Sequence, residues 1–146
     1  MMGGSRRLVL VALAVAVAAA GFVVSWAAIG ALPSGSREQL YVIPKGTWAQ
    51  RYAGKKVEVL PSEIKLTIGV KDVLVLRNDD DVPQMFGPVL IMPGQRFELP
   101  FRLASHYQFA CSLHTNGQLA VVVDPAPEPG WPRLRWRAKS MLDTWL

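Results

Sequence analysis

Residues 8–32, LVLVALAVAVAAAGFVVSWAAIGAL, form an apolar run without a single charged residue. As a helix rising 1.5 Å per residue, this run would be about 37 Å long, more than the hydrocarbon core of a bilayer, about 30 Å. Arg6 and Arg7 precede the run, and Pro33, Ser34 and Gly35 follow it as a clear break. The pattern predicts a membrane-spanning segment within residues 1–32.

A cleaved signal peptide is the alternative interpretation of this segment. Signal peptides also begin with basic residues, and the small residues at 18–20 or 27–28 offer cleavage sites. Their apolar cores usually end after about 15 residues, so the longer run favours a retained single-pass anchor. Under either interpretation the positive-inside rule keeps Arg6 and Arg7 in the cytoplasm. The rest of the chain is then periplasmic or extracellular.

After the apolar run, the sequence predicts strands and no helix between residues 36 and 124. Residues 63–68 alternate polar and apolar side chains, and residues 72–77 and 118–123 are rich in β-branched residues. Shorter candidate strands are residues 40–43, 57–60, 88–92, 95–100 and 106–111. Turn residues separate these runs, which predicts an all-β sandwich over residues 36–124. The consecutive aspartates 79–81 are expected to form a solvated turn rather than a cation site.

The C-terminal segment differs in composition from the predicted sandwich. Residues 125–130, PAPEPG, read as a stiff linker, and residues 131–146 read as a basic amphipathic helix. Its apolar face would carry Trp131, Leu134, Ala138, Met141, Leu142 and Trp145, and its opposite face Arg133, Arg137, Ser140 and Thr144. Such a helix suits membrane lipid, although packing on the sandwich or on a partner subunit is an alternative. Nucleic acid is not expected as a partner, because no basic and aromatic stripe crosses the strands.

Cys111 is the only cysteine of the 146 residues, and His114 is one of two histidines. A lone cysteine in an oxidising compartment cannot form an internal disulfide, so it is a free thiol unless it is buried or ligated. A thiolate and an imidazole three residues apart can converge on one soft metal ion, and copper is the natural candidate. Gln118, just beyond the loop, is of the right type for a weak axial ligand.

From about Glu63 to Asp124 the chain resembles the cupredoxins, the blue copper proteins. The segments that carry the resemblance are EIKLTIGVKDVLVLRNDDDVPQMFGP, IMPGQRFELPF and HYQFACSLHTNGQLAVVV. The resemblance implies a Greek-key sandwich in which Asn78 ends a strand before the first ligand. It also implies that Cys111 and His114 occupy two ligand positions and that the chain transfers electrons without being an enzyme.

One ligand of the resembled family is missing from this chain. Where the family has its first histidine, in a Val-Pro-His pattern before Gly-Pro, this chain has Gln84, followed by Met85. An amide oxygen is a much weaker copper ligand than an imidazole, whereas a thioether from Met85 would favour Cu(I). His106 cannot substitute, because alternation along its strand points it away from the face of Cys111. The candidate ligands are therefore Cys111, His114, Gln118, Gln84 and Met85.

Three functions follow as alternatives from this reading. The first is electron transfer by one copper ion in a membrane-anchored domain that works with a redox partner. The second is a copper-free accessory subunit of a membrane complex, and the third is holding or delivery of Cu(I). Hydrolases and nucleotide-binding proteins have little support, because the sequence has no Gly-rich phosphate loop and no recognisable Ser-His-Asp arrangement.

Overall fold

The computed structural model describes residues 3–32, 35–114 and 116–145, and the chain divides into two compact units. One unit combines Met1–Ala31 with Pro127–Leu146, and the other is Leu32–Ala126. Pro33 and Ser34, where we expected the break after the apolar run, lie outside the described residues. We describe each unit by itself.

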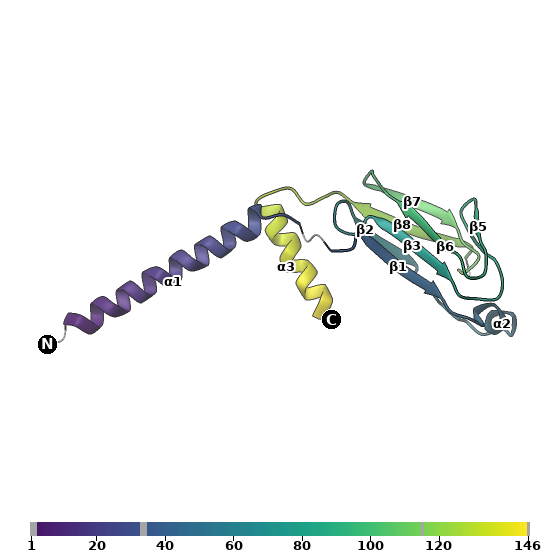
Figure 1. The fold of residues 1–146 in the computed structure, drawn as a ribbon, viewed down its shortest axis with the longest axis horizontal. Coiled ribbons are helices and arrows are strands. Elements are labelled where there is room, and N and C mark those ends of the chain that lie inside the picture. The colour runs from purple at the N-terminus through teal and green to yellow at the C-terminus, as the bar shows by residue number, and fades with distance from the viewer. Residues whose placement is uncertain (1–2, 33–34, 115, 146) are drawn as a thin grey trace. The chain divides into compact units, whose positions relative to one another are not determined.

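The first unit consists of the two long helices, α1 (Gly3–Ile29) and α3 (Trp131–Trp145) (Figure 1). Within α1 the segment Arg7–Ile29, 23 residues, is long and apolar enough to cross a membrane, and none of it is buried in protein. The predicted membrane-length helix is therefore confirmed, and a signal sequence would show the same length and composition. The amphipathic segment after the linker is helical, as predicted, although the side chains beyond Leu142 lie outside the described set.

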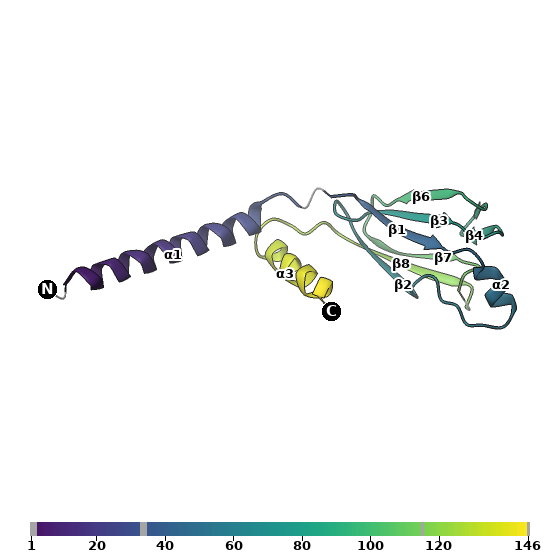
Figure 2. The ribbon, with the colours of Figure 1, turned by 60° about the horizontal axis from the view of Figure 1, so that its bottom comes forward.

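The second unit is built from two three-stranded sheets and a hairpin. One sheet has the order β1-β3-β6 and the other β2-β8-β7, and β4 pairs with β5 (Figures 1 and 2). The strands are β1 (Glu38–Ile43), β2 (Glu63–Thr67), β3 (Val73–Asn78), β4 (Gln84–Phe86), β5 (Val89–Ile91), β6 (Arg96–Pro100), β7 (Ser105–Ala110) and β8 (Gln118–Asp124). β1 runs parallel to β3 and β2 parallel to β8, whereas the other pairs are antiparallel.

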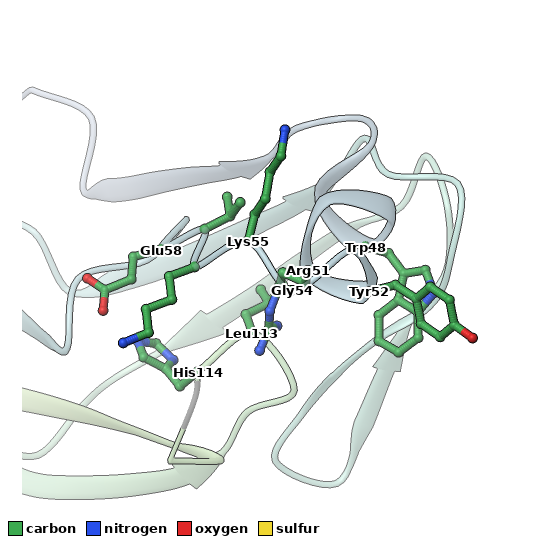
Figure 3. Close-up of a pocket in the computed structure, with 10 residues that line it drawn as sticks. Trp48, Arg51, Tyr52, Gly54, Lys55, Glu58, Leu113 and His114 are labelled. Carbon is green, nitrogen blue, oxygen red and sulfur yellow. The ribbon is translucent and has the colours of Figure 1, made fainter.

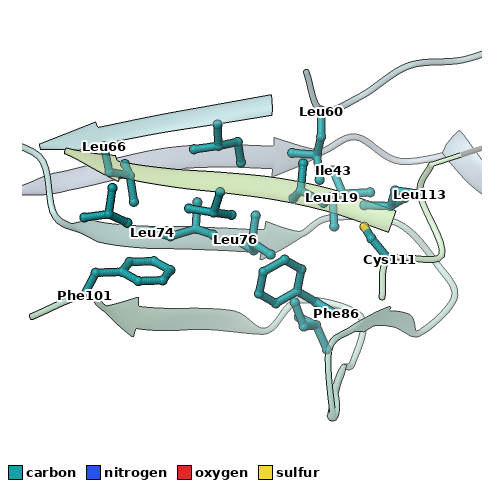
Figure 4. Packing of buried hydrophobic residues seen from close by; sticks show 14 residues of the cluster. Ile43, Leu60, Leu66, Leu74, Leu76, Phe86, Phe101, Cys111, Leu113 and Leu119 are labelled. Carbon is teal, nitrogen blue, oxygen red and sulfur yellow. The ribbon is translucent and has the colours of Figure 1, made fainter. Parts of the chain in front are cut away.

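The core lies between the two sheets, as the alternating sequence pattern predicts. Strand β8 shows the pattern clearly, because Leu119, Val121 and Val123 are buried and the residues between them are not. The buried apolar cluster also takes Ile64 and Leu66 from β2, Leu74 and Leu76 from β3, and Phe86 and Cys111 (Figure 4). The region of residues 32–126 is thus a β-sandwich.

Three local predictions were wrong. Residues 47–52 form a short helix, α2 (Thr47–Tyr52), inside the segment where we expected no helix. Residues 57–60, all described, run without regular structure, and only Leu60 of this segment is buried. The term all-β therefore fits neither the whole chain nor the sandwich unit strictly.

The third error concerns Asp80, which is 3% exposed rather than part of a solvated turn. Its carboxylate accepts hydrogen bonds from the backbone N–H groups of Gly46 and Trp48, both at 2.8 Å, and thereby caps α2 from 32 residues away in the sequence. Burial alone would raise the pKa of Asp80, but these two N–H donors, with the Asp81 N–H and the Gln84 amide, together outweigh it and lower the pKa. Asn78 beside it donates to the carbonyls of Val82 and Ile91, both at 2.9 Å.

We expect Asp80→Asn to lower the free energy of unfolding of the sandwich by about 2 kcal/mol. Asparagine would replace one accepting carboxylate oxygen by an N–H₂ donor, so one buried backbone N–H group would lose its acceptor. Urea denaturation of residues 32–126 would measure the free energy of unfolding. Asp81→Asn is the matched control: Asp81 is exposed and pairs with Lys45, so its loss should cost less than about 0.5 kcal/mol. Equal effects of the two substitutions would contradict the capping role.

Candidate metal centre

Cys111 lies immediately after β7 with its side chain in the apolar core. Its backbone forms a bridge to Phe86 of β4, and its side chain is 1% exposed among Phe86, Leu113 and Leu119 (Figure 4). Burial raises the pKa of the Cys111 thiol, while the backbone N–H groups of Leu113 and His114 and the charge of Arg51 oppose that rise. The thiol is therefore shielded from solvent oxidants, and burial outweighs the groups that favour the thiolate.

His114 is positioned by the loop between β7 and β8. Its backbone N–H donates to the carbonyl of Cys111 at 3.4 Å, and its own carbonyl accepts from Gly117 at 3.0 Å. The ring nitrogen Nε2 lies 3.1 Å from the carbonyl oxygen of Pro61. Because a carbonyl can only accept, Nε2 must carry the hydrogen.

The other ring nitrogen of His114, Nδ1, is buried and has no hydrogen-bond partner. In the neutral tautomer that Pro61 selects, Nδ1 carries a free lone pair. Metal-binding histidines characteristically donate their second ring nitrogen to a carbonyl or carboxylate in this way. Nδ1 is therefore a buried acceptor without a hydrogen-bond partner, which is costly.

Gln84 lies on the interior face of β4, where the resemblance places the first histidine. It is 2% exposed, and it shares this face with Phe86, the residue that bridges to Cys111. Its Oε1 accepts from the Ser112 hydroxyl at 3.0 Å, and its Nε2 lies 3.5 Å from the Asp80 carboxylate. Gln84 is therefore held at both ends of its amide, with one lone pair of Oε1 in use.

The remaining predicted ligands lie elsewhere. Met85 is 46% exposed, because it alternates with the buried Gln84 and Phe86 and faces outward from β4. Gln118 is exposed at the start of β8, one residue before the buried Leu119. His106 is exposed on β7, as predicted. The structure thus keeps Met85 and Gln118 off the interior face that carries Cys111 and Gln84.

A cavity of about 670 Å³ opens beside His114. It is lined by α2, the segment that follows it, and the loop after β7, with Arg51, Glu58, Leu113 and His114 facing it (Figure 3). The Arg51 guanidinium donates to the carbonyl of Ser112 and so joins α2 to the Cys111 loop. The cavity gives a solute a route to the imidazole.

Cys111 and His114 carry a thiol and an imidazole, two donor types that suit copper. Within the described residues, no group of three or more His, Cys, Asp and Glu side chains converges as a metal cage would require. The donors are one thiol and one imidazole with its lone pair free, a soft set that suits copper and favours Cu(I). Sequence reasoning missed Pro61, Ser112 and Arg51, because nothing in the motif shows which carbonyl or hydroxyl each loop will meet.

No protein-family model matches this chain, and no curated protein matches it. Solved structures that are similar include a purple cupredoxin from Nitrosopumilus maritimus, 22% identical, with a TM-score of 0.39 over 58% of this chain and 98% of that chain. A mutant of amicyanin with Cu(I) is 18% identical, with a TM-score of 0.42 over 62% of this chain and 85% of that chain. Both of these structures are cupredoxins, and each is at most 22% identical to this chain.

Proposed function

We propose that this chain is a membrane-anchored extracytoplasmic protein that holds one copper ion, as Cu(I), through Cys111 and His114. The observation that carries the proposal is the buried Nδ1 of His114, which has no partner while Nε2 donates to Pro61. An imidazole fixed in this tautomer is arranged as a metal ligand.

The surroundings of Cys111 set the cost of forming the thiolate that a metal would bind. A metal binds the thiolate, so binding releases the thiol proton, and burial alone would resist this ionisation. The N–H groups of Leu113 and His114 and the positive charge of Arg51 offset this only in part, so the pKa of the Cys111 thiol stays above its ordinary value and the metal must displace the proton. When bound, copper would supply a soft Lewis acid that can exchange one electron.

Cu(I) is favoured over Cu(II) by the number and kind of donors. Cu(I) is satisfied by few, soft ligands, whereas Cu(II) prefers more nitrogen and oxygen donors. Gln84 is already bonded to Ser112 and approaches Asp80. A site with two strong donors therefore suits the holding of copper better than its cycling between oxidation states.

The membrane part of the proposal depends on α1. Its 23-residue apolar segment begins at Arg7, and Arg6 also precedes the apolar run. The positive-inside rule then places the end of α1 and everything after it outside the cytoplasm. Copper bound by the sandwich would then lie on the extracytoplasmic side of the membrane, where a protein partner could take it up.

We expect residues 32–126 to bind one equivalent of Cu(I) in competition with a chromogenic Cu(I) chelator. Cys111→Ser and His114→Ala should each weaken binding by at least about tenfold, because each removes one of two strong donors. Met85→Ala is the matched control and should bind as the wild type does, because Met85 faces outward. Loss of binding in Met85→Ala with no effect of His114→Ala would contradict the proposed ligand set.

Reversible electron transfer is the second candidate function, and the burial of Gln84 on the interior face favours it. The second lone pair of Oε1 is not used by Ser112 and could complete a three-donor site. This candidate requires that Cu(II) give the intense visible band of thiolate-to-copper charge transfer. No copper in either oxidation state, from a folded domain, would contradict both candidates and leave a copper-free accessory subunit of a membrane complex.

We expect Gln84→His to give the Cu(II)-loaded domain a strong visible band, because it places an imidazole on the interior face beside Cys111. The wild type should show at most a weak band under the same conditions. Absorption spectra before and after adding Cu(II) measure the change, and Met85→His is the control, since it places the same ring on the outer face of β4. A band in Met85→His, but not in Gln84→His, would overturn the placement of Gln84.

A further inference from the structure

Helix α3 presents an apolar face whose described large side chains are mostly exposed, with Leu134 half-buried. Trp131, Met141 and Leu142 are 63%, 65% and 64% exposed. At 100° per residue they lie on the same side of the helix as the exposed Ala138. Three large exposed apolar side chains on one face of a helix indicate a binding surface.

The opposite side of α3 is fastened to the end of α1 by two arginines, which we call the arginine clamp, Arg133 and Arg137. Arg133 Nη1 donates to the carbonyls of Ile29 at 3.2 Å and Gly30 at 3.0 Å. Arg137 Nη2 donates to Gly30 at 3.0 Å and Ala31 at 2.6 Å.

The clamp satisfies a specific need at this end of α1. The last carbonyls of a helix have no partner within the helix, and they form the negative end of its dipole. Two guanidinium groups supply both hydrogen bonds and positive charge there. The backbone N–H of Gly130 also donates to the carbonyl of Ala28 at 2.9 Å, so the chain meets α1 just before α3 begins.

The clamp fixes the depth of α3 if α1 spans the bilayer. A 23-residue apolar span places its end at the boundary between acyl chains and headgroups. The side of α3 that carries Arg133 and Arg137 contacts the end of α1. The apolar face is therefore left to contact the lipid at the boundary between acyl chains and headgroups. Tryptophan and arginine are the residues that this interface favours.

The basic residues outside the clamp complete the pattern. Arg135 and Lys139 are exposed and flank the apolar face, and Arg135 lies 5.5 Å from the centre of the Trp131 ring. Exposed cations beside an apolar face suit a surface of anionic headgroups over acyl chains. An apolar groove on a protein would explain only the apolar face. A bilayer explains the apolar face, the positive charges of Arg135 and Lys139, and the position of α3 beside the end of α1.

We propose that α3 lies in the outer headgroup layer of the membrane, with Trp131, Met141 and Leu142 in contact with acyl chains and the arginine clamp holding it to the end of α1. The inference rests on the proposed retention of α1 as an anchor, and it is independent of copper. It makes the last segment of the chain a second membrane contact, which limits how far the sandwich can move from the bilayer.

The test uses the full chain in vesicles of phosphatidylcholine and phosphatidylglycerol, some with brominated acyl chains. An environment-sensitive fluorophore is attached at Met141→Cys, and at Lys65→Cys on the exposed side of β2 as the water reference. Native Cys111 is buried, so the wild type checks that labelling is selective. We expect severalfold stronger quenching by brominated lipid at position 141 than at position 65.

The clamp is tested in the same Met141→Cys chain. Replacing both Arg133 and Arg137 by Gln should reduce the quenching by brominated lipid, because α3 loses its attachment to α1. Arg102→Gln is the control, since Arg102 is an exposed arginine of the sandwich, outside α3. Equal quenching in the double variant and the control would overturn the role of the clamp.

The outcomes separate this inference from the anchor itself. A chain that floats with the vesicles, but whose position 141 is open to aqueous iodide as position 65 is, overturns the lipid contact alone. If the label at position 141 is shielded from both iodide and brominated lipid, α3 packs on protein. That result also overturns the proposed lipid contact. A chain shortened by cleavage after α1, or one that does not float, refutes the proposed anchor and the inference together.

Discussion

The buried carboxylate of Asp80 is the contact on which the candidate site depends. It accepts N–H groups from Gly46 and Trp48, and so holds α2 against the end of the sandwich. It also accepts a hydrogen bond from the amide Nε2 of Gln84. The amide oxygen of Gln84 in turn accepts a hydrogen bond from the hydroxyl of Ser112, the residue after Cys111. One carboxylate thus connects α2, β4 and the loop after β7, and the polar groups that it satisfies would otherwise be buried without partners.

The donors that the site offers to a metal depend on which polar side-chain atoms already have hydrogen-bond partners. Gln84 has partners at both ends of its amide, whereas Nδ1 of His114 has none. The carbonyl of Pro61 decides this difference, because it selects the tautomer that leaves the lone pair on Nδ1. A buried thiol and a preset imidazole are few and soft donors, and for this reason we propose Cu(I) rather than Cu(II).

Much of the fold could be predicted from local sequence pattern, and most of the errors involve contacts between distant residues. Alternation located β2, β-branched residues located β3 and β8, and apolar length located α1, since each of these signals lies within one element. The helix α2 and the burial of Asp80 were missed because the helix is capped by a residue that is remote in sequence. For the site, the sequence supplied Cys111 and His114, but the outward direction of Met85 and the bond from His114 to Pro61 depend on pairing that no motif encodes.

The most direct test of the central claim is X-ray absorption at the copper edge of the Cu(I)-loaded full chain. The account predicts one sulfur and one imidazole nitrogen as the short-range scatterers, with the sulfur lost in Cys111→Ser and the nitrogen in His114→Ala. A spectrum with two imidazoles, or one without sulfur, would contradict the proposed ligands. A second sulfur that disappears in Met85→Ala would show that the thioether, which faces outward in this structure, turns inward to bind copper.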